Sequence, residues 1–350
     1  MTFLSTILAT LSAGEKSDYY AHCADLVLNN YRLDEMTAHF VQHNAGIVFR
    51  LEDIQGKARF LLKIHESAGD ALMDTPEQLA AQMAWLVHLA TDGRVAVQAP
   101  IANHRGQFVT LVQLPGMDRL SPCTVQHWIT AEHAKQWEPK HAHAVGVLLA
   151  TLHSISAEGP QQDPAHFGAY HERYLREGLT QLQITVELGI INATQYELIL
   201  QAGDRIVAYL ARIERTPDRW GLIHGDLHQG NVFFQGDKAA PIDYGPYFSY
   251  FLYDLGVSLY HATFDEVSIR KALVSGYDSV RPLTQSDPET LETFMLAAAL
   301  TNLAFQATLQ EHRLSAINRR NMLQFVEKFC RPFVANEPFL FDGRSLTIDH

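Results

Sequence analysis

Three oxygen-bearing side chains that could bind a metal ion lie close together in the sequence. Asp226 and Asn231 occur in the polar, glycine-containing segment Leu222–Phe234, and Asp243 follows a turn. Two carboxylates and an amide oxygen are hard ligands of the kind that Mg²⁺ prefers, with water and phosphate oxygens completing the octahedron. A carboxylate that does not bind metal can accept a proton from a substrate hydroxyl. The alternative is structural: Asp226 would cap a helix or turn, and Asn231 would be a turn residue. This alternative is less favoured because Asp226, Asn231 and Asp243 all occur in one non-helical segment.

A hairpin is the element that we expect to bring two of these side chains together. Val232–Phe234 and Ala240–Ile242 are apolar and are separated by a turn signal. If they pair as a tight hairpin centred near Asp237, Asn231 and Asp243 face each other at its open end. Facing residues of an antiparallel pair have Cα atoms about 4.5–5.5 Å apart, so both side chains would lie near the preceding polar loop.

The motif His224-x-Asp226-x-x-x-x-Asn231, with Asp243-x-Gly245 after it, resembles the catalytic and metal-binding loops of the aminoglycoside phosphotransferase and choline kinase family. This family is related to the protein kinases. The resemblance implies that Asp226 is the catalytic base and that Asn231 and Asp243 bind Mg²⁺. It also implies that His224 braces the loop. The alternative is that His224 is a buried histidine with only a structural role. The implied catalytic set is His224, Asp226 and Asn231.

Two further features follow the metal-binding motif. Tyr253-Asp254-Leu255 resembles the helix start at which this family's aspartate holds the catalytic loop by hydrogen bonds. An ordinary N-cap is the alternative role for Asp254. Core packing explains most of the aromatic cluster in this region, and we hypothesise from position alone that Tyr247 lines the acceptor pocket.

The same resemblance places the nucleotide against the N-terminal part. Lys63, near the end of a returning strand, matches the family's ATP-contacting lysine, where a cation neutralises phosphate charge. A lysine on a strand is otherwise usually exposed to solvent. Asn44 and Gly46 occupy the position of the phosphate-covering loop, which has one glycine here instead of the three of protein kinases. We expect Asn44 or the backbone around Gly46 to approach phosphate.

Two other nucleotide contacts are implied by position. Glu77 is the candidate partner of Lys63, although an acid in a first helical turn is also favoured by the helix dipole. Gln82 stands where some relatives carry glutamate. Gln113 and Leu114 fall where the family has its hinge, whose backbone would bind the adenine edge.

The elements that hold these residues are predicted to form a two-lobed, protein-kinase-like α+β fold. Residues 1–114 would comprise an N-terminal helix and a nucleotide-binding lobe with a small antiparallel sheet, and residues 115–350 a larger, mainly helical lobe with the catalytic and metal-binding loops. The break at Leu114-Pro115-Gly116 sets this boundary. The elements expected in the small lobe are strands at Ile47–Glu52, Phe60–Ile64, 96–102 and 108–114, and a helix that begins at Pro76 after the N-cap Thr75.

Composition narrows the class of protein. The 350 residues include 27 Lys and Arg against 39 Asp and Glu, and the net charge of −12 argues against nucleic-acid partners. Three widely spaced cysteines give neither a disulfide framework nor a zinc pattern, and no apolar run approaches the ~20 residues that span a bilayer. The P-loop and G-x-S-x-G motifs are both absent from the sequence. We therefore expect a cytoplasmic protein without nucleic-acid or membrane partners.

The function expected from these features is ATP- and Mg²⁺-dependent transfer of the γ-phosphoryl group to a hydroxyl of a small molecule, as in aminoglycoside, choline or homoserine kinases of the family. Two alternatives stay open. One is a protein Ser/Thr kinase of the bacterial stress-response type, and the other is a nucleotide-binding protein with little catalysis. The sequence predicts neither the identity of the acceptor nor the oligomeric state.

Overall fold

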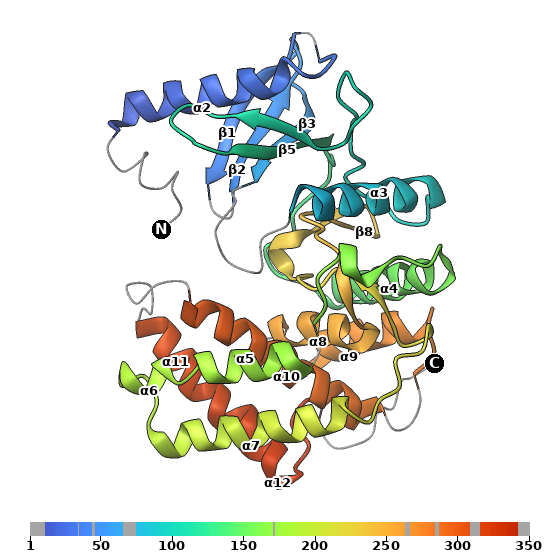
Figure 1. Cartoon of the computed structure of the whole chain (residues 1–350). Coiled ribbons are helices and arrows are strands. Elements are labelled where there is room, and N and C mark those ends of the chain that lie inside the picture. Colours follow the sequence, from blue (N-terminus) through green and yellow to red (C-terminus); the bar gives the residue numbers. More distant parts are fainter. Residues whose placement is uncertain are drawn as a thin grey trace. The chain divides into compact units, whose positions relative to one another are not determined.

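The structure is a computed structural model that describes residues 11–33, 35–43, 46–65, 75–170, 172–262, 267–283, 287–308 and 316–341. Asn44, a predicted nucleotide contact, lies outside the described residues. The chain divides into two compact units (Figure 1). The first is Met1–Ala131 with Ala165–Phe167, and the second is Glu132–Pro164 with Gly168–His350.

A five-stranded antiparallel sheet forms the centre of the first unit. Its strands, in spatial order, are β1 (Thr37–His43), β2 (Gly46–Glu52), β3 (Ala58–His65), β5 (Leu120–His127) and β4 (Thr110–Gln113). Ile47, Phe49 and Leu51 alternate with less buried residues along β2 and point into the core. Helix α2 (Ala13–Leu28) lies along the sheet and adds Cys23 and Val27 to this core (Figure 1).

Helix α3 (Pro76–Asp92) begins as the sequence predicts. Thr75 and Gln78 form a reciprocal capping box, and Pro76 occupies the first turn, where its missing N–H is not needed. The helix ends at Gly93, whose φ of 76° is the left-handed conformation that glycine adopts without strain.

The last part of the sheet differs from the prediction. Residues 96–102 form no regular strand apart from a bridge between Pro100 and Gln126. Strand β5 was not predicted, because its interior is buried on both faces and so lacks the apolar–polar alternation of a half-exposed strand. Since β5 pairs with β3 and β4, the sheet continues past Leu114-Pro115-Gly116.

The second unit is mainly helical, so the predicted α+β fold class is confirmed. Its two short antiparallel ribbons are β6 (Trp220–Ile223) with β9 (Tyr247–Tyr250) and β7 (Val232–Gln235) with β8 (Lys238–Pro241). Its helices are α4 (Pro139–Glu158), α5 (Glu172–Gln181), α6 (Ile184–Glu187), α7 (Ala193–Leu210), α8 (Phe251–His261), α9 (Val267–Asp278), α10 (Asp287–Thr308), α11 (Ala316–Phe325) and α12 (Arg331–Ala335), with a 3₁₀ turn at Gln229–Asn231 and a π-helical turn at Val326–Cys330.

Two glycines let helices α4 and α9 approach each other closely. A Cβ atom at Gly146 would lie 2.0 Å from the carbonyl oxygen of Leu273, and one at Gly276 would lie 2.0 Å from that of His143. Such contacts are far inside van der Waals range, so the interface requires glycine on both helices. In the part of the chain that the structure describes, no helix is long and apolar enough to cross a membrane.

Candidate active site

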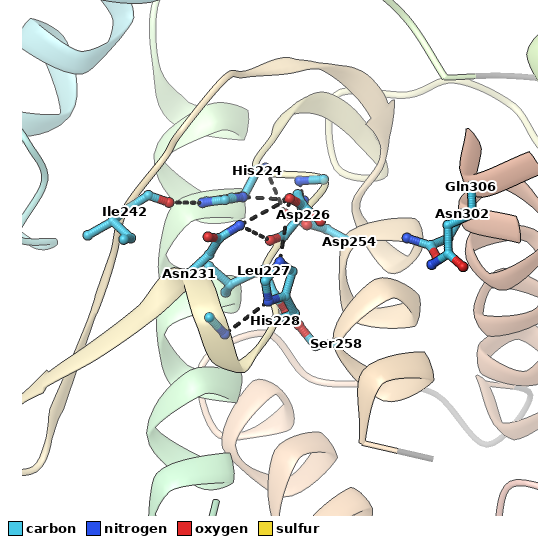
Figure 2. Close-up of polar contacts among 12 residues, drawn as sticks. His224, Asp226, Leu227, His228, Asn231, Ile242, Asp254, Ser258, Asn302 and Gln306 are labelled. Carbon is cyan, nitrogen blue, oxygen red and sulfur yellow. Dashed lines mark hydrogen bonds and ion pairs between the residues drawn. The ribbon is translucent and has the colours of Figure 1, made fainter. Parts of the chain in front are cut away.

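The catalytic loop predicted from the sequence begins where strand β6 ends. The side-chain amide of Asn231 donates hydrogen bonds to the carbonyl oxygen of Asp226 (2.9 Å) and to its carboxylate Oδ2 (3.0 Å) (Figure 2). His228 accepts a hydrogen bond from the amide of Gly230 (2.9 Å), and its Nε2 lies 3.7 Å from Asp226 Oδ2. The loop therefore curls around the Asp226 carboxylate, and the predicted pair Asp226 and Asn231 is in direct contact.

The hairpin after this loop forms, but its register differs by one residue from the prediction. Val232 pairs with Pro241, and the amide of Ile242 donates to the carbonyl of Asn231 (2.9 Å). Asn231 therefore faces Ile242, and the prediction that it faces Asp243 is wrong. The cause is a two-residue turn at Gly236-Asp237, in which Gly236 has a φ of 60°. Such turns match the twist of paired strands better than one centred on a single residue.

Asp243 instead follows the hairpin in a left-handed conformation, with a φ of 54°. A non-glycine residue rarely adopts this conformation, and it costs of order 1 kcal/mol or more. Strain of this kind persists where the surrounding structure fixes it, which is common at functional sites.

His224 connects the catalytic loop to the strand that leads to Asp243. Its Nε2 donates to the carbonyl of Ile242 (3.1 Å), and its Nδ1 accepts from the amide of Asp226 (3.3 Å). Because the ring is fully buried, desolvation lowers the pKa of His224. The negative charges of nearby aspartates raise this pKa, but their effect is smaller. The neutral form is also the one whose Nδ1 can accept a hydrogen bond. These contacts agree with the bracing role that the resemblance implies.

Asp254 holds the catalytic loop from the opposite side. Its carboxylate accepts hydrogen bonds from the backbone amides of His224 and Gly225, both at 2.8 Å (Figure 2), and from Nε2 of His153 at 3.1 Å. Burial alone would raise the pKa of Asp254, but the hydrogen bond and charge of His153 hold it below its usual value. The N-cap of α8 is Tyr250, so the capping alternative for Asp254 is wrong and the loop-bracing contact is confirmed.

Hydroxyl groups of other residues also brace the loop, in a role that the sequence does not predict. The hydroxyl of Tyr247 donates to the carbonyl of Gly225 (2.9 Å), and that of Ser258 donates to the carbonyl of Leu227 (2.7 Å). Gly225 has a φ of 77°, and a Cβ atom there would lie 1.7 Å from the Tyr247 hydroxyl. The glycine between His224 and an aspartate is the sequence signal for this close approach.

The electrostatics of Asp226 suit a proton acceptor beside a cation site. Desolvation by surrounding protein raises the pKa of Asp226, although 56% of its side-chain surface is exposed. The negative charge of Asp243 raises it further, while His228, His224 and the hydrogen bond from Asn231 act in the opposite direction. A divalent cation bound between the carboxylates of Asp226 and Asp243 would offset the repulsion between their negative charges.

The side-chain oxygens near the catalytic loop are of the kind that binds Mg²⁺. Because Nδ2 of Asn231 donates to Asp226, its Oδ1 is the atom that would be left to bind metal, and the Asp243 carboxylate is the predicted second oxygen ligand. The described residues contain no cluster of three or more His, Cys, Asp or Glu side chains that could hold a metal ion. This sparse oxygen set fits Mg²⁺, which commonly binds one or two carboxylates together with substrate phosphates and water.

The predicted nucleotide contacts lie in the first unit and stay predictions. Lys63 lies on β3, opposite Val48 on one side and Thr124 on the other. Gly46 begins β2, and a Cβ atom there would lie 2.5 Å from the carbonyl oxygen of Ile64. Close strand packing therefore requires a glycine at this position, whatever its role toward phosphate.

The remaining nucleotide candidates have local roles of their own. Glu77 is exposed in the first turn of α3, and hydrogen bonds from its own amide and from Thr75 lower its pKa. Gln82 is buried on the same helix. The side-chain amide of Gln113 donates to the carbonyl of Met117, and Leu114 is buried.

Comparison with known proteins places the chain in a family. Residues 42–286 match the family described as "Phosphotransferase enzyme family". A homoserine kinase of Agrobacterium fabrum is 28% identical over 222 residues, which cover 61% of this chain and 63% of that protein. The match thus spans slightly less than two thirds of that relative.

Solved structures share the fold at lower identity. A microcompartment-associated aminopropanol kinase has a TM-score of 0.72 and 20% identity, covering 93% of this chain and 99% of that one. Amicoumacin kinase, in complex with AMP-PNP, Ca²⁺ and Ami, has a TM-score of 0.69 and 17% identity, covering 95% of this chain and 98% of that one. The chain therefore belongs to the phosphotransferase enzyme family, and the predicted family, enzyme class and kinase-like fold are confirmed.

Proposed function

We propose that this member of the phosphotransferase enzyme family transfers the γ-phosphoryl group of ATP to a hydroxyl of a small molecule, with Mg²⁺ as the metal. The observation that carries the proposal is the contact of Asp226 with Asn231 on a loop that Asp254 and His224 hold by hydrogen bonds. In phosphoryl transfer the protein takes little part in bond making and breaking, and catalysis comes mainly from positioning the reactants. A loop that holds one carboxylate in a fixed position therefore contributes much of the catalysis.

Asp226 orients the acceptor hydroxyl and accepts its proton at Oδ2 or Oδ1. The hydrogen bond from Asn231 to Oδ2 fixes the rotation of this carboxylate. A pKa above that of an ordinary aspartate makes the carboxylate a better base. His224 stays neutral and acts only by positioning the backbone of the loop.

Mg²⁺ would be held by Oδ1 of Asn231 and by the carboxylate of Asp243. When bound, it neutralises charge on the phosphates of the nucleotide. In the first unit, Lys63, Asn44 and Gly46 are proposed to contact phosphate, Glu77 to orient Lys63, and the backbone of Gln113 and Leu114 to bind adenine.

The acceptor that we propose is a small amino alcohol or hydroxy amino acid. Homoserine and aminopropanol, the substrates in the names of two relatives, each carry a hydroxyl and an amine. Asn302 and Gln306 extend from α10 toward the catalytic loop (Figure 2), and Gln306 donates to Asn302 at 2.7 Å. Neutral amides can accept from an ammonium group and donate to a carboxylate, which suits this substrate class.

A panel of acceptors tests the proposal. ADP release would be measured with ATP and Mg²⁺ in the presence of homoserine, 1-amino-2-propanol, choline or kanamycin, with EDTA as the metal control. We expect turnover with a small amino alcohol or hydroxy amino acid, and loss of turnover in Asp226→Asn. Turnover with kanamycin alone would contradict the acceptor class, and equal ADP release with and without every acceptor would contradict the transfer reaction.

The alternatives are separated by two further measurements. Incorporation of ³²P into proteins of a cell lysate would support the protein kinase alternative. Binding of Mg²⁺–ATP without turnover of any acceptor would support a nucleotide-binding protein with little catalysis.

A further inference from the structure

A cavity of about 520 Å³ lies in the second unit, away from the catalytic loop. Its described lining residues come from helices α4, α7, α8, α9 and α10, from β9, and from the segments that precede β6 and follow α9. Five of them are aromatic: Tyr209, Tyr250, Phe251, Tyr277 and Phe294. A cavity of this size and composition is typical of sites for small organic ligands.

The tyrosine rings present apolar surface because their hydroxyls bond to protein. The hydroxyl of Tyr250 donates to the carbonyls of Leu210 (3.2 Å) and Ile213 (3.1 Å). The hydroxyl of Tyr209 lies 2.7 Å from that of Thr290. The faces of these rings can therefore pack against an aromatic group.

One end of the cavity is positively charged. Among its described lining residues, Arg219 and Arg281 are the cations and Asp218 is the anion. Nε of Arg219 lies 3.7 Å from the Asp218 carboxylate, whereas Arg281 donates to the backbone carbonyl of Asp218 (2.7 Å) and lies 4.9 Å above the ring of Phe251. Guanidinium groups bind carboxylates by paired hydrogen bonds, so this end favours an anionic group.

Two walls of the cavity contact the residues that hold the catalytic loop. The ring of Phe251 stacks on His153 with centroids 4.7 Å apart and an interplanar angle of 15°. The hydroxyl of Tyr277 lies 3.0 Å from Nδ1 of His153, whose Nε2 donates to Asp254. Asp254 in turn accepts the two backbone amides of the catalytic loop. Phe251 is thus packed between Arg281 and the buried His153–Asp254 pair.

We propose that this cavity is a second ligand site, which binds a small monocarboxylate with an aromatic body, and that its occupancy stabilises the catalytic loop. The aromatic group lies among the tyrosine and phenylalanine rings, and the carboxylate bonds to Arg281 and Arg219. A ligand that fixes Phe251 and Tyr277 reduces the motion of His153 and Asp254, and so protects the loop amides that Asp254 binds. Neither part of this proposal depends on the proposed phosphotransfer.

Calorimetric titration of the full chain, without nucleotide, tests the binding. The probe is indole-3-acetate, with the neutral indole-3-acetamide and inorganic phosphate as matched ligands that lack the charge or the aromatic body. We expect saturable binding of indole-3-acetate and binding at least about tenfold weaker for the other two, since one lost charge-assisted pair is worth about a factor of ten.

Variants locate the site. Arg281→Gln removes the charge and should weaken binding of indole-3-acetate about tenfold or more. Val280→Trp, at a half-exposed lining position, fills the cavity and should abolish binding without removing any charge. Arg331→Gln removes an exposed arginine that does not line the cavity and should leave binding unchanged. If Arg281→Gln does not fold, Val280→Trp alone decides the location.

Hydrogen exchange tests the coupling. Bound indole-3-acetate should slow exchange of the His224 and Gly225 amides, and should have no such effect in Val280→Trp. Absence of saturable binding, or equal binding by wild type and Val280→Trp, would overturn the site. Binding that leaves both amides unchanged would overturn the coupling to the loop.

Discussion

At the scale of single residues, the proposed reaction depends on the Asp226 carboxylate, which accepts a hydrogen bond from Asn231 and lies 3.7 Å from Nε2 of His228. Asp226→Asn keeps the size of the side chain and removes the base, so we expect kcat to fall by about 10²–10⁴-fold. Because the side chain is partly exposed, the free energy of unfolding should change by less than about 1 kcal/mol. Steady-state kinetics and urea unfolding measure the two quantities.

The matched control for this substitution is Asp237→Asn, at the exposed tip of the β7–β8 hairpin. It makes the same chemical change and should retain wild-type kcat. Retention of full activity by Asp226→Asn would show that another group accepts the proton.

The hydroxyl of Tyr247, the residue predicted from its position to line the acceptor pocket, donates to the carbonyl of Gly225 in the catalytic loop. Tyr247→Phe removes this bond, worth about 1 kcal/mol, so we expect kcat to fall about threefold to tenfold. Tyr196→Phe removes a similar bond to the carbonyl of Leu179 and should leave kcat unchanged. A larger effect on the acceptor KM than on the ATP KM would favour a direct acceptor contact by Tyr247.

The sequence predicted the identity of the loop residues better than their contacts. The spacing of His224, Asp226 and Asn231 is local and could be matched to a known pattern. The hydrogen bonds from Tyr247 and Ser258 join residues far apart in the chain, and they depend on where β9 and α8 pack. Such contacts have no local sequence signal beyond the permissive glycine at Gly225.

At the scale of elements, the length of the turn in the β7–β8 hairpin determines its register, which the sequence did not predict correctly. The β7–β8 hairpin was predicted correctly as an element, but a two-residue turn shifted its register by one residue. Since a one-residue shift changes every facing pair, Asn231 faces Ile242 instead of Asp243. Asp243 lies beyond this pair, in a left-handed conformation that the sequence did not predict.

The close packing of α4 on α9 gives a prediction for helix interfaces. Gly146→Ala places a methyl group 2.0 Å from the carbonyl oxygen of Leu273, so the helices must separate. We expect a loss of about 1–3 kcal/mol in the free energy of unfolding, measured by urea denaturation. Gly14→Ala in α2 has no atom within 4 Å of the new methyl group and should be neutral or slightly stabilising. Equal stability of the two variants would contradict this account of the interface.

At the scale of the whole molecule, buried histidines make the folded state sensitive to acid. Burial lowers the pKa of His153, His224 and His261 in the folded chain. An unfolded histidine has a pKa of about 6.5 and binds a proton as the pH falls below that value. The unfolded state then binds more protons than the folded state, so the free energy of unfolding decreases with falling pH.

His261 gives the sharpest test of this sensitivity. Burial, together with the charge of His228, lowers the pKa of His261 to about 4. Its contribution should therefore be lost progressively from pH 6.5 to pH 4, by up to about 3 kcal/mol. Urea unfolding across this range should show a shallower decrease for His261→Gln than for wild type, whereas His22→Gln, at an exposed position on α2, should follow wild type. The same slope in His261→Gln and wild type would show that His261 is not the group that titrates.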